Sequence, residues 1–112
     1  MTLGENQEAF MRDVEKLLIY LHINGYSVRG GELERTQAQQ EIYYNTGKSK
    51  TMQSNHLKRC AIDLHIFKNG AWLQSKQDLQ EIGNYWEGLN SLNRWGGNFT
   101  SFLDTPHFER NC

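Results

Sequence analysis

The segment from residue 60 to residue 73 constrains the fold more than any other part of the chain. Between residues 60 and 67, aliphatic side chains alternate with polar or aromatic ones, which is the two-residue period of a half-buried strand. Asn69 and Gly70 come next and favour a tight hairpin turn, so residues 71–73 are expected to return as the partner strand. We therefore expect an antiparallel sheet, with Asp63 on the face opposite the aliphatic side chains.

Helices are expected on either side of this hairpin in the sequence. Apolar residues at helical spacing predict helices over residues 5–23 and 75–90, and Thr36 with Gln39 resembles a capping box that opens a helix through residue 45. Further short strands are expected at residues 26–29 and 107–109, and residues 94–99 are expected to be irregular or strand-like. The larger aromatic residues are interpreted as core rather than as a carbohydrate-binding surface: Trp72, Trp86, Phe99 and Phe102. This order of elements indicates an α+β domain, a small antiparallel sheet flanked by helices.

The composition is typical of a small single-domain protein. The chain has 112 residues, of which 38% are hydrophobic, and we expect residues 1–112 to form one domain without a membrane span. The formal net charge of −1 argues against nucleic acid as a partner, because binding to phosphate backbones requires a basic surface. No secretory signal is recognisable at the N-terminus, and we expect a monomer.

The two cysteines, Cys60 and Cys112, do not form a CxxC pair. Two cysteines are too few to indicate a disulfide framework, and a bridge between them would tie the last residue to a core strand. We expect Cys60 to be a small buried hydrophobic residue rather than half of a disulfide bond.

Three residues with metal-binding side chains stand in or beside predicted strands. His56 precedes the strand at residues 60–67, Asp63 lies within that strand, and His107 begins the last one. Two imidazoles and one carboxylate give zinc three ligands and leave its fourth position free for water, which is typical of a catalytic rather than a structural metal. These residues therefore predict a catalytic zinc site.

The spacing of these residues resembles the motifs of a known family. The chain carries Ser54-x-His56, Ala61-x-Asp63 and Asp104-x-x-His107, which is similar to the SxHxxGxAxD and (D/E)xxH patterns of the M15 metallopeptidases. The resemblance extends from about residue 30 to residue 109. It implies a Hedgehog/DD-peptidase-like fold and Zn2+ bound by His56, Asp63 and His107.

The same resemblance implies roles for residues around the metal. Asp104, three residues before a ligand, corresponds to the general base, which takes a proton from water and passes it to the leaving amine. Residues 33–40 resemble the family segment (Y/F)RTxxxQ, so Arg35 is expected to bind the substrate carbonyl or stabilise the oxyanion. Ser54 and Trp95 are expected to contact the substrate or line the site. His65, which shares a strand face with Asp63, is expected in the cleft rather than on the metal.

Arg59 departs from the family pattern, because it stands where the family motif has glycine. The change removes no ligand. We expect it to affect the conformation of the local turn and, through the turn, the choice of substrate.

These observations predict a zinc metallopeptidase that hydrolyses an amide bond in the peptide stem of bacterial peptidoglycan. The family resemblance favours the L-alanyl-D-glutamate endopeptidase of a phage or prophage lysis system, cytoplasmic until it is released to the cell wall. The alternatives are a D-alanyl-D-alanine carboxypeptidase, a zinc hydrolase of another small peptide or amide, and a non-catalytic zinc-containing binding module of the same fold. Asp104 and Arg35 favour an enzyme over the module, because a structural metal site needs neither residue.

Overall fold

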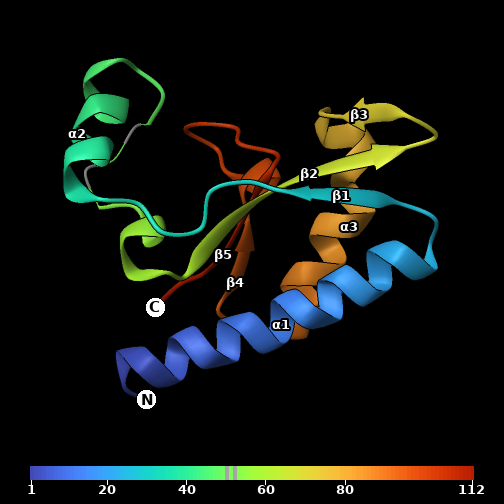
Figure 1. Ribbon diagram of the computed structural model, residues 1–112, viewed down its shortest axis with the longest axis horizontal. Coiled ribbons are helices and arrows are strands. Elements are labelled where there is room, and N and C mark those ends of the chain that lie inside the picture. The colour runs from blue at the N-terminus through green and yellow to red at the C-terminus, as the bar shows by residue number, and fades with distance from the viewer. Residues whose placement is uncertain (50, 52) are drawn as a thin grey trace.

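The computed structural model describes residues 1–49, 51 and 53–112 and forms an α+β fold, as the sequence predicts (Figure 1). The helices and strands follow in the order α1 (Leu3–Ile23), β1 (Ser27–Gly30), α2 (Gln37–Asn45), the 3₁₀ helix η1 (Asn55–Lys58), β2 (Ala61–Lys68), β3 (Ala71–Leu73), α3 (Lys76–Leu89), β4 (Asn93–Trp95), the 3₁₀ helix η2 (Gly96–Asn98) and β5 (His107–Arg110). Side-chain caps begin the helices where the sequence suggests. Thr36 accepts from the backbone N–H of Gln39 at α2, and Ser75 accepts from that of Asp78 at α3.

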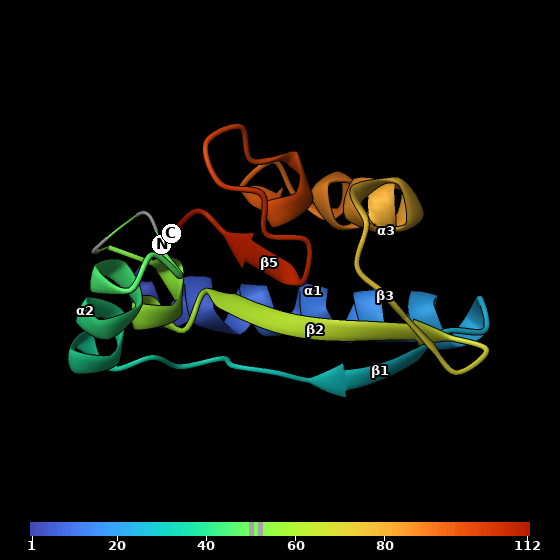
Figure 2. The same cartoon turned by 90° about the horizontal axis from the view of Figure 1, so that it is seen from above.

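The sheet is antiparallel and has the strand order β1-β2-β5-β4, with β3 paired to the far end of β2. The predicted hairpin is present, with Phe67 opposite Trp72. Figure 2 shows β1, β2 and β5 side by side with α1 behind them. The first half of β2 pairs with β5 and the second half with β3, so one long strand serves both parts of the sheet.

One face of the sheet and two helices enclose the core. Leu64 and Ile66 point from β2 into this core, in agreement with the predicted alternation. The helices α1 and α3 supply most of the remaining buried apolar side chains: Phe10, Val14, Leu17, Leu21, Leu79, Ile82 and Trp86. The odd-numbered residues of β2 lie on the other face, and this face carries the candidate site.

The aromatic residues do not all belong to this core. Trp86 is fully buried and packs edge-on against Phe10 and Phe108. The prediction is wrong for Trp72, which is 47% exposed because β3 lies at the edge of the sheet. Phe99 and Phe102 are partly buried.

Cys60 and Cys112 form a disulfide bond, with Cα atoms 6.6 Å apart, so the expectation of an unpaired Cys60 is wrong. The reason is the β2–β5 pairing. The backbone N–H of Arg110 donates to the carbonyl of Cys60 at 2.8 Å, which carries the end of the chain back to the start of β2. The bridge therefore fastens together the two strands that hold Asp63 and His107.

Among the residues that the structure describes, no helix is both long and apolar enough to cross a membrane.

Candidate metal centre and cleft

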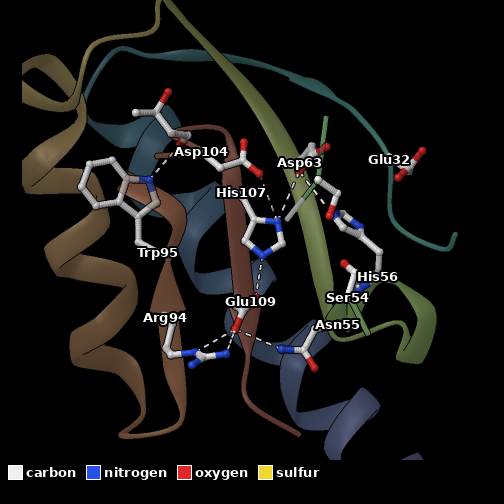
Figure 3. A network of polar contacts seen from close by, with 12 residues as sticks. Glu32, Ser54, Asn55, His56, Asp63, Arg94, Trp95, Asp104, His107 and Glu109 are labelled. Carbon is white, nitrogen blue, oxygen red and sulfur yellow. Dashed lines mark hydrogen bonds and ion pairs between the residues drawn. The ribbon is translucent and has the colours of Figure 1, made fainter. Parts of the chain in front are cut away.

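Three side chains from three different elements converge on the open side of the sheet. His56 lies in η1, Asp63 in β2 and His107 at the start of β5, and Asp63 and His107 are directly opposite each other in the antiparallel pair. One nitrogen or oxygen atom from each residue lies within 4.8 Å of those of the other two. The three residues selected from the sequence are thus brought together (Figure 3).

His56 is held in one orientation by its surroundings. Ser54 caps η1 and accepts from the backbone N–H of His56 at 3.2 Å, and the imidazole is only 1% exposed. Its Nδ1 lies 2.9 Å from the carbonyl oxygen of Leu33. Because a carbonyl only accepts, Nδ1 carries the hydrogen, and the lone pair of Nε2 faces Asp63.

The tautomer of His107 is opposite to that of His56. Nε2 of His107 lies 2.6 Å from Oε1 of Glu109 and donates to it. Nδ1 therefore faces the site, 3.7 Å from Oδ1 of Asp63 and 3.8 Å from Oδ2 of Asp104. Histidine ligands commonly have this arrangement, in which one nitrogen meets the metal and the other donates to a carboxylate or carbonyl.

The contact between His56 and Asp63 fits a bound cation. Nε2 of His56 and Oδ1 of Asp63 lie 3.3 Å apart, and both are buried without a hydrogen-bond partner among the described residues. Two facing acceptors repel each other unless a proton or a cation lies between them. Tetrahedral zinc separates neighbouring ligand atoms by about 3.3 Å, given bonds of about 2.0 Å. The residues present therefore suit a zinc-sized ion.

The charges at the site also match a metal centre. Burial raises the pKa of Asp63, but the neighbouring imidazoles of His107 and His56 outweigh burial and hold this pKa well below its ordinary value. Burial lowers the pKa of His107, yet the neighbouring carboxylates of Asp63 and Glu109 raise it to about 9. Without a metal, His107 therefore carries a second proton at neutral pH, and its positive charge offsets the negative charges of Asp63 and Glu109.

Asp104 is placed by the backbone of η2. Its N–H donates to the carbonyl oxygen of Gly96 at 3.0 Å, and its own carbonyl accepts from the N–H of His107 at 3.1 Å. The side chain is partly exposed and lies beside the metal ligands rather than among them. Burial raises the pKa of the Asp104 carboxyl, and the charge of His107 opposes this shift.

A cleft of about 590 Å³ opens over these residues. His56, Asp104 and His107 line it together with Arg35 and Ser54. The segment 98–102 lines the cleft as well.

Arg35 is fixed at the edge of this cleft. Its guanidinium donates to Glu32, to Gln40 at 2.7 Å and to Ser54 at 3.5 Å, and its side chain is only 9% exposed. The ring of Tyr43 lies against it, 4.6 Å from the guanidinium carbon. A cation held in this way needs little reorganisation to meet negative charge that develops in the cleft.

Two of the residues singled out in the sequence lie elsewhere. Trp95 is fully buried, and its indole N–H donates to the carbonyl of Thr105 at 2.8 Å, so it cannot contact a substrate as expected. Its ring fills the space beside Gly83 and Gly97, where any Cβ would collide with it. His65 does not line the cleft; its ring lies 5.2 Å from that of Trp72, near the hairpin end of β2.

Glu109 was missed by sequence reasoning, although its position in the predicted strand gave a signal. Residues two apart in a strand share a face, so Glu109 follows His107 onto the same side of β5. Its carboxylate is buried and is held by Arg94 and Asn55, while its pKa is lowered by His107 and Arg94 against the opposing effect of burial.

Arg59 adopts left-handed backbone geometry, with φ 54° and ψ 33°, where glycine is favoured. The turn that leads from η1 into β2 is therefore retained despite the larger residue. The Arg59 side chain is largely exposed, lies 3.5 Å from Glu34 and borders a separate surface hollow rather than the cleft. Arg59 thus lies at the turn and outside the lining of the cleft.

A family model described as D-alanyl-D-alanine carboxypeptidase, of the M15 peptidases, matches residues 47–110, more than half of the chain. The chain belongs to the M15 peptidase family. The matched segment includes His56, Asp63, Asp104 and His107. Members of the M15 family are generally metal-dependent, in keeping with the His-Asp-His geometry.

Relatives of the chain extend the comparison beyond the family model. The chain is 34% identical over 112 residues to a protein of Listeria phage A118 named L-alanyl-D-glutamate peptidase. This match covers 97% of the chain and 38% of the phage protein. The chain thus spans well under half the length of that relative. The crystal structure of the Serratia marcescens L-Ala D-Glu endopeptidase ChiX has the same fold, with a TM-score of 0.74 and 23% identity over 96% of this chain and 84% of that one.

Proposed function

We propose that the protein is a zinc-dependent peptidase that hydrolyses the L-alanyl-D-glutamate bond in the peptide stem of bacterial peptidoglycan. The observation that carries this proposal is the facing pair of unpartnered acceptors, Nε2 of His56 and Oδ1 of Asp63, with Nδ1 of His107 beside them in a cleft. His56, Asp63 and His107 would hold the zinc. When bound, zinc lowers the pKa of a coordinated water to near 7 and polarises a carbonyl group.

Asp104 supplies the proton transfer in this proposal. Its carboxylate lies close to the ligands without joining them, and burial makes it a stronger base than a free aspartate. It accepts a proton from the attacking water as the C–O bond forms. It then gives that proton to the amine of D-glutamate as the C–N bond breaks, which leaves a free L-alanine carboxylate and a free D-glutamate amine.

Arg35 stabilises the negative charge that develops on the carbonyl oxygen. The guanidinium is aligned by Glu32, Gln40 and Ser54 before any substrate arrives. Ser54 therefore acts on both sides of the site, because its hydroxyl contacts Arg35 and also caps the helix of His56.

The choice of bond rests on the phage relative, whose name specifies L-alanyl-D-glutamate. The description of the family model supports the second candidate, a D-alanyl-D-alanine carboxypeptidase. We further propose that the chain acts on the cell wall after release from the cytoplasm, in the manner of a phage or prophage lysis enzyme.

Digestion of purified peptidoglycan followed by mass analysis of the released peptides tests the proposal. A new L-alanine carboxylate with a new D-glutamate amino terminus is expected. Loss of the terminal D-alanine would instead identify the carboxypeptidase, and absence of any cleavage by zinc-loaded protein would identify a binding module. Asp104→Ala serves as the matched inactive control.

The identity of the metal requires its own measurement. We expect one zinc ion per chain by elemental analysis, and His107→Ala should lower that content because it removes a ligand. Unchanged zinc content in His107→Ala would contradict the ligand assignment.

A further inference from the structure

Glu109 joins three elements around the candidate metal site. Oε1 of its carboxylate accepts from Nε2 of His107 at 2.6 Å, and Oε2 accepts from Asn55 at 3.0 Å and from Nε of Arg94 at 2.8 Å. These partners lie in β5, η1 and β4, respectively. Figure 3 shows the carboxylate between the imidazole of His107 and the side chains of Arg94 and Asn55. Glu109 is 4% exposed, so its carboxylate is shielded from solvent, although the Arg94 side chain beside it is 51% exposed.

The contact with His107 decides which of its nitrogens faces the metal. A carboxylate only accepts hydrogen bonds, so it keeps a hydrogen on Nε2 and leaves the lone pair on Nδ1. Nδ1 is the atom that faces Asp63. Without this carboxylate, the hydrogen of the neutral ring is free to move to Nδ1, where it blocks coordination.

The contact with Asn55 acts on the other histidine. Asn55 is the first residue of η1 and immediately precedes His56. Its hydrogen bond to Glu109 spans 54 positions in the sequence and holds the start of η1 against β5. The same carboxylate therefore constrains both imidazoles, His107 by direct contact and His56 through its neighbour.

We propose that Glu109 is the positioning residue of the metal site, which sets the tautomer of His107 and fixes η1 relative to β5. This inference rests on the proposed zinc function of His56, Asp63 and His107. It adds a residue that is not one of the three ligands and acts through them.

Glutamine at this position tests the role without a change of size. An amide has one accepting oxygen, and Arg94 and Asn55 together supply three donors that compete for it with the single donor of His107. The amide NH₂ group is therefore expected to turn toward His107. That orientation makes Nε2 of His107 an acceptor and transfers its hydrogen to Nδ1.

The experiment compares wild type, Glu109→Gln and the exposed control Glu34→Gln by zinc titration against a competing chelator. We expect a 10- to 100-fold loss of zinc affinity in Glu109→Gln and none in Glu34→Gln. Nitrogen-15 NMR of the zinc-loaded proteins supplies a readout that a merely structural role would not change. A hydrogen on Nε2 of His107, protected from exchange, is expected in wild type and should be lost or weakened in Glu109→Gln.

Zinc affinity within twofold of wild type and an intact Nε2 signal in Glu109→Gln would overturn the inference while leaving the proposed function in place. Failure of the wild type to bind zinc would overturn the proposed function, and the inference with it. Asn55→Ala provides a second test should Glu109→Gln fail to fold, because it keeps the pair of Glu109 and His107 and removes only the link to η1. It is expected to weaken zinc binding about threefold to tenfold, and unchanged affinity would overturn the proposed role of Glu109 in holding η1.

Discussion

A Cβ atom on Gly96 would lie 2.0 Å from the carbonyl oxygen of Asp104. It would also come within 2.9 Å of Cβ of His107. No side chain fits in this space, so the backbone of η2 and the loop that carries Asp104 are in direct contact. The absence of a side chain at Gly96 thus allows the backbone of Asp104, the proposed base, to lie against η2.

Gly96→Ala should therefore displace Asp104. We expect a loss of about 1–3 kcal/mol in the free energy of unfolding from overpacking, and a fall in kcat/KM of about 100-fold from misplacement of the base. Gly88→Ala in α3 is the matched control, since a Cβ there meets nothing within 4 Å. Gly88→Ala should retain activity and gain about 0.5–1 kcal/mol. Equal activity in the two variants would contradict the positioning role of Gly96.

Asp104→Ala separates chemistry from metal binding. Because Asp104 lies beside the three ligands and not among them, zinc content should remain at one per chain. Turnover of peptidoglycan should fall by about 10²–10⁴-fold, the usual contribution of a general base. Elemental analysis and the digestion assay are made on the same preparation, and undiminished turnover would exclude Asp104 from the mechanism.

Arg59→Gly should stabilise the protein. The left-handed backbone at φ 54° costs a non-glycine residue roughly 1 kcal/mol, and the exposed pair with Glu34 contributes little. We expect a gain of up to about 1 kcal/mol in urea denaturation, with peptidase activity unchanged because Arg59 lies outside the cleft. Arg59→Ala removes the same ion pair and keeps the strain, so it should not be stabilising. Destabilisation by glycine would contradict this account.

The metal-free protein should lose stability between pH 6.5 and pH 9. The pKa of His107 is raised in the folded state from its ordinary 6.5 to about 9, so its imidazolium stabilises the fold fully below pH 6.5 and loses this effect as pH rises through about 9. The loss amounts to at most about 3 kcal/mol. Zinc requires the neutral ring, so the stabilisation on adding zinc should increase over the same interval. Thermal unfolding with chelator and with zinc measures both trends, and a flat metal-free profile would contradict the charge assigned to His107.

Reduction of the disulfide should destabilise the protein by roughly 4 kcal/mol, because Cys60 and Cys112 are 52 positions apart and the bridge restricts a long loop of the unfolded chain. Denaturation with and without reductant measures the difference. Cys112→Ala, which lacks the bridge under both conditions, should show no response to reductant. An equal response in wild type and variant would mean that reductant acts elsewhere.

Short-range patterns in the sequence were enough to predict most of the fold and the three metal ligands. The alternation over residues 60–67 identified β2 and the side of the sheet on which Asp63 lies. The motif positions of His56 and His107 then fell in η1 and β5, beside it. Each of these assignments depends on residues that are close in the sequence.

What the patterns missed depends on contacts between distant segments. Trp95 is buried because Gly83, in another element, leaves room for its ring. Cys112 reaches Cys60 only because β5 pairs with β2. His107 lies only two positions from Glu109, but Asn55 and Arg94 lie 54 and 15 positions away, so no local motif points to the whole network.

The pairing of Asp63 with His107 makes the site sensitive to a slip of a single residue between β2 and β5. Because neighbouring residues of a strand face opposite sides, such a slip would turn His107 away from Asp63 and leave only His56 and Asp63 facing each other. The complete ligand set therefore forms only when β5 has paired with β2 in this register, which joins residues 44 positions apart. In the proposed peptidase, the register of this one strand pair therefore decides whether all three ligands can meet.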